Sequence, residues 1–338
     1  MVMAQSLFIT LKNAYPDCQI DVLAPAWSLA LLERMPEVSK AIVMPLAHGE
    51  FGLRARINQG RSLRAANYQQ AIIWPNSWKS AITPWAAGIP VRTGYIGECR
   101  WGLLNDARKL DRKLLPMTVQ RMVALGLPKT LPLPPEYPLP RLLIGANQQA
   151  AVIHKFQLSS LKNILALCPG AEYGAAKRWP ASYYAQVARQ QIARGWQVWL
   201  FGSDNDRAAT AQINREVGGE CLDLTGRTSI AEAVDLLSLV DVVVTNDSGL
   251  MHIAAALDKK IIALFGSSDP NFTPPLHSAA HVISLNMTCA PCFEHECPLG
   301  HTRCLTDIEP ARVTNAIVQI TGTEHAVAGV GAVCGLPK

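Results

Sequence analysis

Short apolar runs rich in β-branched residues alternate with amphipathic stretches along most of the chain. Four such runs precede residue 127 and six follow residue 145, each with the length and composition of a strand. The predicted strands are Ile20–Ala24, Ala41–Met44, Ala71–Trp74, Arg92–Tyr95, Ile164–Leu167, Gln197–Phe201, Cys221–Leu224, Val242–Thr245, Ile261–Phe265 and Val282–Leu285. Strands that alternate with helices favour parallel sheets covered by helices on both faces. The pattern therefore predicts an α/β fold.

A proline-rich segment divides this pattern in two. Six prolines lie between Leu127 and Pro140, where neither a helix interior nor a central strand would accept them. We predict a Rossmann-like domain over residues 1–126, a linker over 127–145, a second such domain over 146–320 and a flexible tail over 321–338. A length of 338 residues agrees with two domains. Two domains joined in this way place a ligand cleft between them.

The ends of several predicted helices carry recognisable signals. Ser229 and Glu232 have the spacing of a capping box, and Gly195 follows an amphipathic segment as a stop. The first helix, over Met1–Tyr15, comes before the first strand, whereas doubly wound domains begin with a strand and a loop. We expect that the first strand and loop of this domain are missing from the sequence, because circular rearrangement is rare.

One strand leads directly into a polar turn and a helix. The turn is Asp247-Ser-Gly249, and His252 lies one turn into the helix. Ligands of open α/β sheets bind at the carboxyl ends of strands. Asp247 and Ser248 are expected to cap the helix, and Gly249 lets the backbone approach an anion bound by free N–H groups. An ordinary helix cap with a packed histidine is the alternative interpretation.

A second candidate anion site lies upstream, in a strand followed by a glycine-containing loop. The loop ends with Lys177 and Arg178, and Pro180 is expected in the first turn of the next helix. Each cation could bind a phosphate through charge-assisted hydrogen bonds of about 1.5–3 kcal/mol. The alternative is a solvated surface pair.

Composition excludes several functions and leaves one cluster open. The net charge of +5 is modest and scattered, so it gives no argument for nucleic acid. Without an apolar run of about 18–20 residues or a signal peptide, the chain is expected to be cytoplasmic, with reduced cysteines. Cys289, Cys292, Cys297 and Cys304 are clustered, with His295 and His301 between them. They could bind a structural metal, form a loop with reduced thiols, or form a disulfide.

Six motifs together resemble one enzyme family. They are Asp21–Trp27, Pro75–Ser80, Gly88–Gly94, Pro169–Pro180, Leu224–Ser229 and Thr245–His252. This combination resembles the bacterial ADP-heptose:lipopolysaccharide heptosyltransferases of glycosyltransferase family 9, over about residues 1–320. The resemblance implies a GT-B fold of two facing Rossmann-like domains, with the donor on the second and the acceptor on the first. It also implies that the four cysteines bind no catalytic metal and that no cofactor is needed.

The resemblance further implies an inverting, metal-independent transfer of heptose from ADP-heptose to the heptose already on the lipid A–Kdo core. Lys177 and the amides of Ser248 and Gly249 would stabilise the diphosphate as it gains charge. Thr228 would lie beside the adenine, unless it merely caps a helix. The donor-binding residues implied are Glu172, Tyr173, Lys177, Thr228, Asp247, Ser248, Gly249, Leu250 and His252.

On the acceptor side, Asn76, Ser77 and Lys79 follow a strand end. Four arginines close by in sequence could face the acidic glycolipid acceptor at the inner membrane, or form a solvated helix face. They are Arg54, Arg56, Arg61 and Arg64.

The sequence departs from the family at its catalytic base. In that family the base is an aspartate of a Gly-Asp pair before the first helix, and no such pair occurs here. We therefore expect donor binding with poor transfer. A binder of nucleotide sugar without activity, or a heptosyltransferase of another step, remains open. A Rossmann oxidoreductase is disfavoured because no Gly-x-Gly-x-x-Gly follows a strand.

Overall fold

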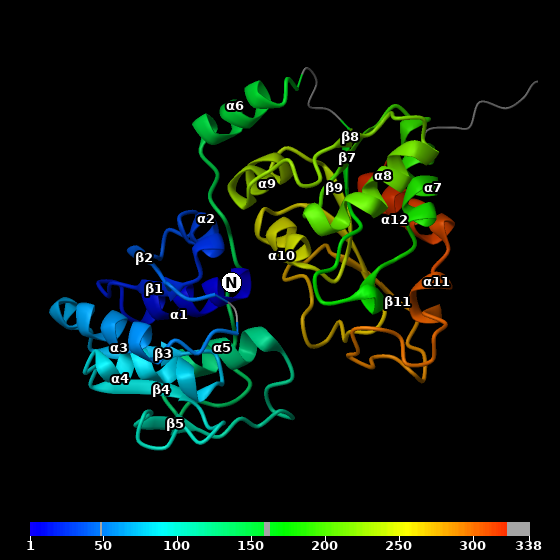
Figure 1. Ribbon diagram of the computed structural model, residues 1–338. Helices are drawn as coiled ribbons and strands as arrows, with labels where there is room; N and C mark the ends of the chain where they lie inside the picture. Colours follow the sequence, from blue (N-terminus) through cyan, green and yellow to red (C-terminus); the bar gives the residue numbers. More distant parts are fainter. Residues whose placement is uncertain (48, 159–162, 323–338) are drawn as a thin grey trace, which may run out of the picture.

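The computed structural model describes residues 1–47, 49–158 and 163–322. Figure 1 shows two α/β lobes side by side, a first lobe before residue 127 and a second lobe after residue 145, with the N-terminus between them. The two-lobed α/β architecture predicted from the sequence is confirmed. Of the predicted tail, residues 323–338 lie outside the described residues.

The first lobe contains two small sheets whose strands are all parallel. One sheet pairs β1 with β2, and the other has the order β3-β4-β5. The strands are β1 (Asp21–Ala24), β2 (Lys40–Val43), β3 (Gln70–Ile73), β4 (Val91–Tyr95) and β5 (Asp106–Arg108). The four strands predicted here are confirmed within one residue. The sequence did not reveal β5, because its three residues are mostly polar.

Helices cover these sheets. The predicted helix over Met1–Tyr15 is confirmed as a 3-10 turn followed by an α-helix. The helical elements are η1 (Val2–Ala4), α1 (Gln5–Ala14), η2 (Ala26–Ser28), α2 (Leu29–Leu32), α3 (Leu53–Ser62), η3 (Arg64–Ala66), η4 (Trp78–Ala81), α4 (Ile82–Ala86) and α5 (Thr118–Gly126). Leu7 and Phe8 of α1 are buried with Val119 and Val123 of α5, which anchors the start of the chain in the core.

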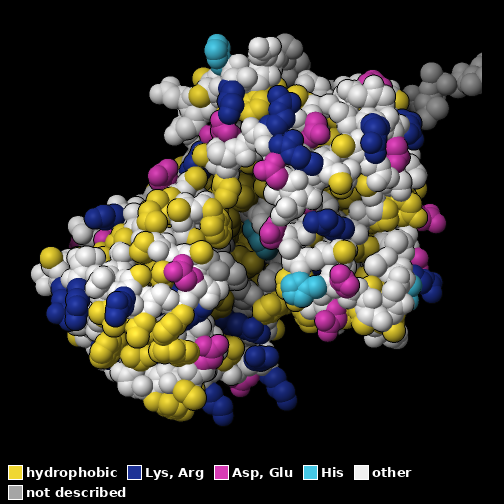
Figure 2. Space-filling view, in the orientation of Figure 1, with side chains coloured by type: hydrophobic (Ala, Val, Ile, Leu, Met, Phe, Trp, Pro, Cys, Tyr) yellow, Lys and Arg dark blue, Asp and Glu magenta, His cyan; other side chains and the backbone are white. Residues whose placement is uncertain are grey.

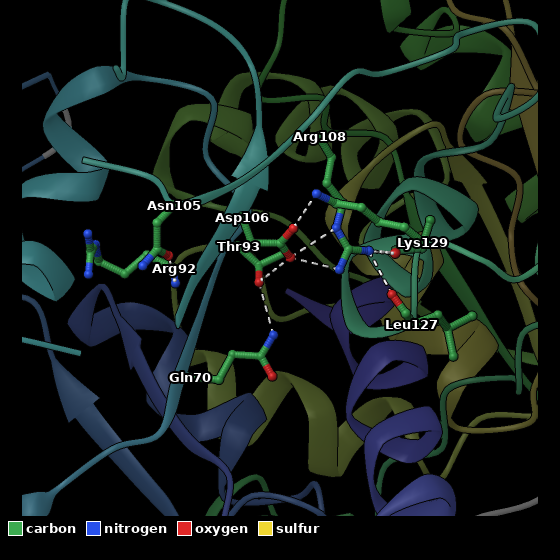
Figure 3. Close-up of polar contacts among 9 residues, drawn as sticks. Gln70, Arg92, Thr93, Asn105, Asp106, Arg108, Leu127 and Lys129 are labelled. Carbon is green, nitrogen blue, oxygen red and sulfur yellow. Dashed lines mark hydrogen bonds and ion pairs between the residues drawn. The ribbon is translucent and has the colours of Figure 1, made fainter. Parts of the chain in front are cut away.

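A chain of hydrogen bonds crosses β3, β4 and β5 (Figure 3). Gln70 donates to the Thr93 hydroxyl at 2.9 Å, which donates to Asp106 at 2.9 Å. The Asp106 carboxylate also pairs with Arg108 at 2.9 Å and with Lys129 at 2.7 Å. Burial opposes ionisation of Asp106, but the hydrogen bonds from Lys129, Arg108 and Thr93 prevail and lower its pKa to about 2. This network fixes the short edge strand to its neighbours.

The second lobe is built on one six-stranded parallel sheet with the order β11-β10-β9-β6-β7-β8. Its strands are β6 (Ile164–Cys168), β7 (Gln197–Leu200), β8 (Leu222–Asp223), β9 (Val242–Asn246), β10 (Lys260–Phe265) and β11 (His281–Ser284). All six predicted strands are confirmed in position. β6 and β9 lie at the centre with every residue buried, which explains their nearly continuous apolar sequences.

The helices of this lobe cover both faces of the sheet. They are α6 (Ala146–Lys155), η5 (Ala175–Lys177), α7 (Ala181–Ile192), η6 (Asp204–Asp206), α8 (Arg207–Glu216), α9 (Ile230–Leu237), α10 (Gly249–Ala256), α11 (Arg303–Thr306) and α12 (Pro310–Thr321). The capping box of Ser229 and Glu232 is confirmed at the start of α9. Gly195 adopts a φ of +80° just after α7, as a helix stop requires. Pro180 was predicted inside the first turn of α7, but it occupies the N-cap, one residue earlier.

Buried contacts join the lobes. Arg34 of the first lobe pairs with Asp235 of α9 at 2.7 Å, and both side chains are almost fully buried. The side chain of Gln5 also exchanges two hydrogen bonds with the backbone of Arg141, which ties the first lobe to the segment between the lobes. The described residues between α5 and α6 form no helix or strand, which supports a linker there. We propose that the first domain ends at residue 126 and that the second begins at residue 146. No helix of the described residues is both long and apolar enough to span a bilayer.

Candidate functional site

The two anion-binding motifs meet at the carboxyl ends of adjacent central strands. Cys168 at the end of β6 is in register with Thr245 of β9, so the loops that follow lie side by side. The buried Asn246 side chain joins them: its amide donates to the Pro169 carbonyl at 2.7 Å, and its oxygen accepts from the Trp179 backbone at 3.2 Å. Asn246 was not singled out from the sequence, although a polar residue that ends a buried strand was the available signal.

Lys177 and Asp247 form an ion pair at the centre of the site. The Lys177 ammonium lies 2.6 Å from the Asp247 carboxylate, and the two side chains are 16 % and 7 % exposed. The same ammonium lies 4.9 Å from the centre of the Tyr173 ring. The structure therefore brings three of the predicted donor residues together.

The expected helix cap is wrong in detail. Asp247 pairs with Lys177 instead of capping α10. Ser248 occupies the N-cap position, but its side chain forms no cap hydrogen bond and lies 3.1 Å from the Thr245 hydroxyl. The first amides of α10 are therefore not satisfied by a side-chain cap, and Gly249 has open space where a Cβ would point. This arrangement suits an anion.

The second cation of the upstream motif does not accompany the first. Arg178 binds the Asp206 carboxylate at 3.3 Å and the Ala171 carbonyl of the loop after β6 at 3.4 Å. The two neighbouring cations thus have different carboxylate partners, and the contact of Arg178 with a phosphate stays a prediction.

His252 lies beside the ion pair. The pKa of His252 is lowered to about 4, chiefly by burial; the charge of Asp247 opposes this shift, and the charges of the Met1 amino group and Lys177 add to it. The imidazole is therefore neutral at pH 7. Its Nδ1 has no hydrogen-bond partner in the structure. A neutral ring with a free nitrogen can serve a ligand as donor or acceptor.

The remaining predicted donor residues lie on the same edge of the sheet. Glu172 is exposed on the loop after β6, and Leu250 packs partly buried against the core. Thr228 follows the edge strand β8, and the helix cap there is Ser229. The capping alternative for Thr228 is therefore wrong, and its place beside an adenine stays a prediction.

The segment between β11 and α11 contacts the loop after β6, here called the donor loop. Tyr173 donates through its hydroxyl to the Phe293 carbonyl at 2.7 Å, and its ring stacks on His295 with centroids 3.9 Å apart. The Ala176 amide donates to the His295 carbonyl at 3.0 Å. A Cβ on Gly174 would lie 2.3 Å from that carbonyl oxygen, so this close approach requires glycine. No feature of the local sequence indicated this contact.

The predicted acceptor residues lie on the loop after β3. Asn76 is exposed and accepts a hydrogen bond from Arg100 at 2.8 Å, while Lys79 donates to the backbone carbonyls of Gly49 and Glu50. Ser77 precedes η4. The buried guanidinium of Arg100 also binds the Pro75 carbonyl at 2.8 Å, so Arg100 shapes this loop. Arg100 was not identified from the sequence.

The four arginines do not form one surface. Arg56 is buried and donates to the carbonyls of Phe51 and Glu50, which corrects the prediction for this residue. Arg54, Arg61 and Arg64 are exposed. Figure 2 shows lysine and arginine side chains at the α3 end of the first lobe, and a hollow between the two lobes.

A solved heptosyltransferase has the same architecture. The structure of E. coli ADP-heptose LPS heptosyltransferase II matches with a TM-score of 0.84 and 42% identity, covering 95% of this chain and 94% of that chain. Two facing Rossmann-like lobes, with a ligand-type site at the strand ends of the second, define a glycosyltransferase of the GT-B class.

Sequence comparison identifies the family. The profile of glycosyltransferase family 9 (heptosyltransferase) matches residues 56–303. Lipopolysaccharide heptosyltransferase 2 of Salmonella typhimurium is 45% identical over 333 residues, 96% of each protein. Lipooligosaccharide heptosyltransferase 2 of Haemophilus influenzae is 47% identical over 296 residues, 84% of this chain and 85% of that protein. The chain belongs to glycosyltransferase family 9, the heptosyltransferases.

Proposed function

We propose that this enzyme transfers heptose from ADP-heptose to the first heptose of the lipopolysaccharide inner core. The names of its similar relatives support this substrate pair, since they are lipopolysaccharide or lipooligosaccharide heptosyltransferases 2. The observation that carries the proposal is the position of Lys177. Its ammonium lies where the β6 and β9 loops meet, beside uncapped helix amides.

The donor's diphosphate is assigned to Lys177 and the amides of Ser248 and Gly249. Cleavage of the sugar–phosphate bond leaves charge on the diphosphate, and fixed cations and amides stabilise it most where water is excluded. His252 can donate to a phosphate oxygen, and Asp247 can accept from a sugar or ribose hydroxyl. Glu172, Tyr173, Thr228 and Leu250 complete the proposed donor site.

The acceptor is assigned to the first lobe, with Asn76, Ser77 and Lys79 as its contacts. Three exposed tryptophans support contact with a lipid-linked acceptor at the inner face of the inner membrane: Trp27 after β1, and Trp74 and Trp78 after β3. Indole rings favour membrane interfaces, and the exposed Arg54, Arg61 and Arg64 would add attraction to anionic lipid. The protein would thus work in the cytoplasm.

The proposed transfer is inverting and needs no divalent ion for catalysis.

Mass spectrometry of a core acceptor can test the proposal. The enzyme would be incubated with ADP-heptose and acceptors that carry either no heptose or one heptose, with and without added Mg²⁺. Addition of one heptose to the second acceptor alone, unchanged by Mg²⁺, is expected. Addition to the acceptor without heptose would assign another step. ADP binding without transfer over long incubation would indicate a non-catalytic binder, and a strict need for Mg²⁺ would overturn the metal-free mechanism.

A further inference from the structure

Four cysteines of one segment line a single small cavity in the second lobe. Cys289, Cys292, Cys297 and Cys304 lie between β11 and the first turn of α11, and all four are unpaired. The cavity has a volume of about 20 Å³ and is bounded by all four side chains. This is room for about one water-sized sphere, and hence for one ion. The spacing alone left their role open, whereas the fold places the thiols around one space.

The surroundings of the sulfurs suit thiolates. The Thr302 amide donates to the Cys297 sulfur at 3.4 Å. The Ser267 hydroxyl in the cavity wall is buried and has no hydrogen-bond partner in the structure. Gly266 leaves room beside the Cys304 sulfur, which lies 3.0 Å from where a Cβ of Gly266 would be. Donors of this kind stabilise metal-bound thiolates and orient them.

We propose that Cys289, Cys292, Cys297 and Cys304 together bind one zinc ion. Four thiolates in tetrahedral arrangement favour zinc or iron over hard cations such as Mg²⁺. Each thiol releases its proton to solvent when it binds, so the site forms with loss of protons. As the side chains stand, no group of three or more potential ligands among the described residues is arranged to hold an ion. Binding therefore requires the thiols to turn into the cavity that they line.

The ion would position the donor loop and take no part in transfer. Ala176, the neighbour of Lys177, forms part of the cavity wall. Between Cys292 and Cys297 lie Phe293 and His295, whose carbonyls accept the hydrogen bonds from Tyr173 and Ala176. Fixing the cysteines at both ends of this stretch would fix the surface against which the loop packs. This consequence for the donor rests on the proposed function, whereas the metal site itself does not.

Elemental analysis of the whole protein can test the site. The protein would be purified under reducing conditions without added metal or a metal-affinity column, and its zinc and iron measured by mass spectrometry. About one zinc per chain is expected, with a strong loss in Cys292→Ser and Cys304→Ser. Cys99→Ser, an exposed cysteine of the first lobe, is the matched control and should keep the metal. Iron in place of zinc at the same stoichiometry would support the metal site and show that the bound ion is iron.

Further measurements keep the test decisive if the serine variants fail to fold. Wild-type protein loaded with Co²⁺ should show thiolate-to-cobalt charge-transfer absorption, which Zn²⁺ abolishes. Metal removal should lower the melting temperature and raise the Kd for ADP several-fold. Metal-free wild-type protein that gains no cobalt spectrum, or an intact mass that shows a disulfide among the four cysteines, would overturn the proposal. Metal binding without any effect on ADP would leave the site in place and remove its link to the donor loop.

Discussion

The Lys177 ammonium and the Asp247 carboxylate are 2.6 Å apart, and this ion pair links the loop after β6 to the turn after β9. The pair holds the cation at the point where the two loops meet, with its long side chain already ordered. A diphosphate that binds here must share Lys177 with Asp247. The proposed site therefore combines a fixed positive charge with an acceptor that can turn to a ligand hydroxyl.

Replacement of Lys177 tests the donor site directly. In Lys177→Ala, the loss of a charge-assisted hydrogen bond of about 1.5–3 kcal/mol should raise the Kd for ADP roughly 10- to 100-fold. Isothermal titration calorimetry would measure it. The control is Lys155→Ala, which removes the exposed ion pair with Glu232 between α6 and α9. Equal ADP affinity of wild type and Lys177→Ala would remove Lys177 from the site.

Gly249→Ala separates ligand approach from folding. The structure leaves open space at the Cβ position of Gly249, which begins α10 with an ordinary φ. Alanine is also the better helix former, so the melting temperature should stay the same or rise. ADP affinity should fall, because the methyl group would stand where the diphosphate meets the helix amides. A variant that is stable and binds ADP like wild type would place the diphosphate elsewhere.

Asp106→Asn should destabilise the first lobe in a pH-dependent way. The folded pKa of about 2 lies below the ordinary value of 3.8, so this carboxylate stabilises the fold above pH 3.8 and loses that contribution as the pH falls toward 2. At neutral pH the variant leaves Arg108 without its carboxylate partner and should lose about 1–2 kcal/mol of unfolding free energy. Urea unfolding at neutral and acidic pH should show a deficit that shrinks with acidification. A deficit independent of pH would contradict this role of the charge.

Much of the fold follows from the apolar pattern alone. The central strands β6 and β9 of the second lobe are short apolar runs that are buried on both faces, and this leaves a clear signal in the sequence. The strand β5 left none, because Asp106 and Arg108 are held there by contacts with β4 and the residues after α5. Hydrogen bonds between distant residues stabilise such a strand, and local sequence does not encode them.

The motifs of the candidate site could be predicted from the sequence, whereas the ion pairs between its side chains could not. The loop with Lys177 and the turn with Asp247 were recognised separately, and parallel strand order brought them together. Asp247 pairs with Lys177 instead of the helix amides, and Arg178 pairs with Asp206. These pairings depend on distances between elements that are far apart in the sequence. The contact of His295 with the donor loop is of the same kind.

Lys79→Ala tests the acceptor side independently of the donor. The Lys79 ammonium donates hydrogen bonds to the backbone carbonyls of Gly49 and Glu50. These acceptors are neutral and bind an ammonium more weakly than an anion does, so an acidic acceptor substrate should displace them. The KM for the core acceptor should rise several-fold while the Kd for ADP stays unchanged. A change in ADP affinity with no change in acceptor KM would place Lys79 on the other side of the reaction.

The lowered pKa of His252 predicts a loss of stability in mild acid. The pKa of this histidine is near 6.5 in the unfolded chain and near 4 in the folded protein. Between these two values the unfolded chain therefore binds a proton that the folded protein does not bind. The unfolding free energy should therefore fall between pH 6.5 and 4, with a slope from this group of at most about 1.4 kcal/mol per pH unit. His252→Gln keeps a polar side chain without the titration, so its unfolding free energy should change less over the same range. Identical pH profiles for the two proteins would show that His252 is protonated as easily in the fold as outside it, and that the site beside Lys177 is wetter than its burial indicates.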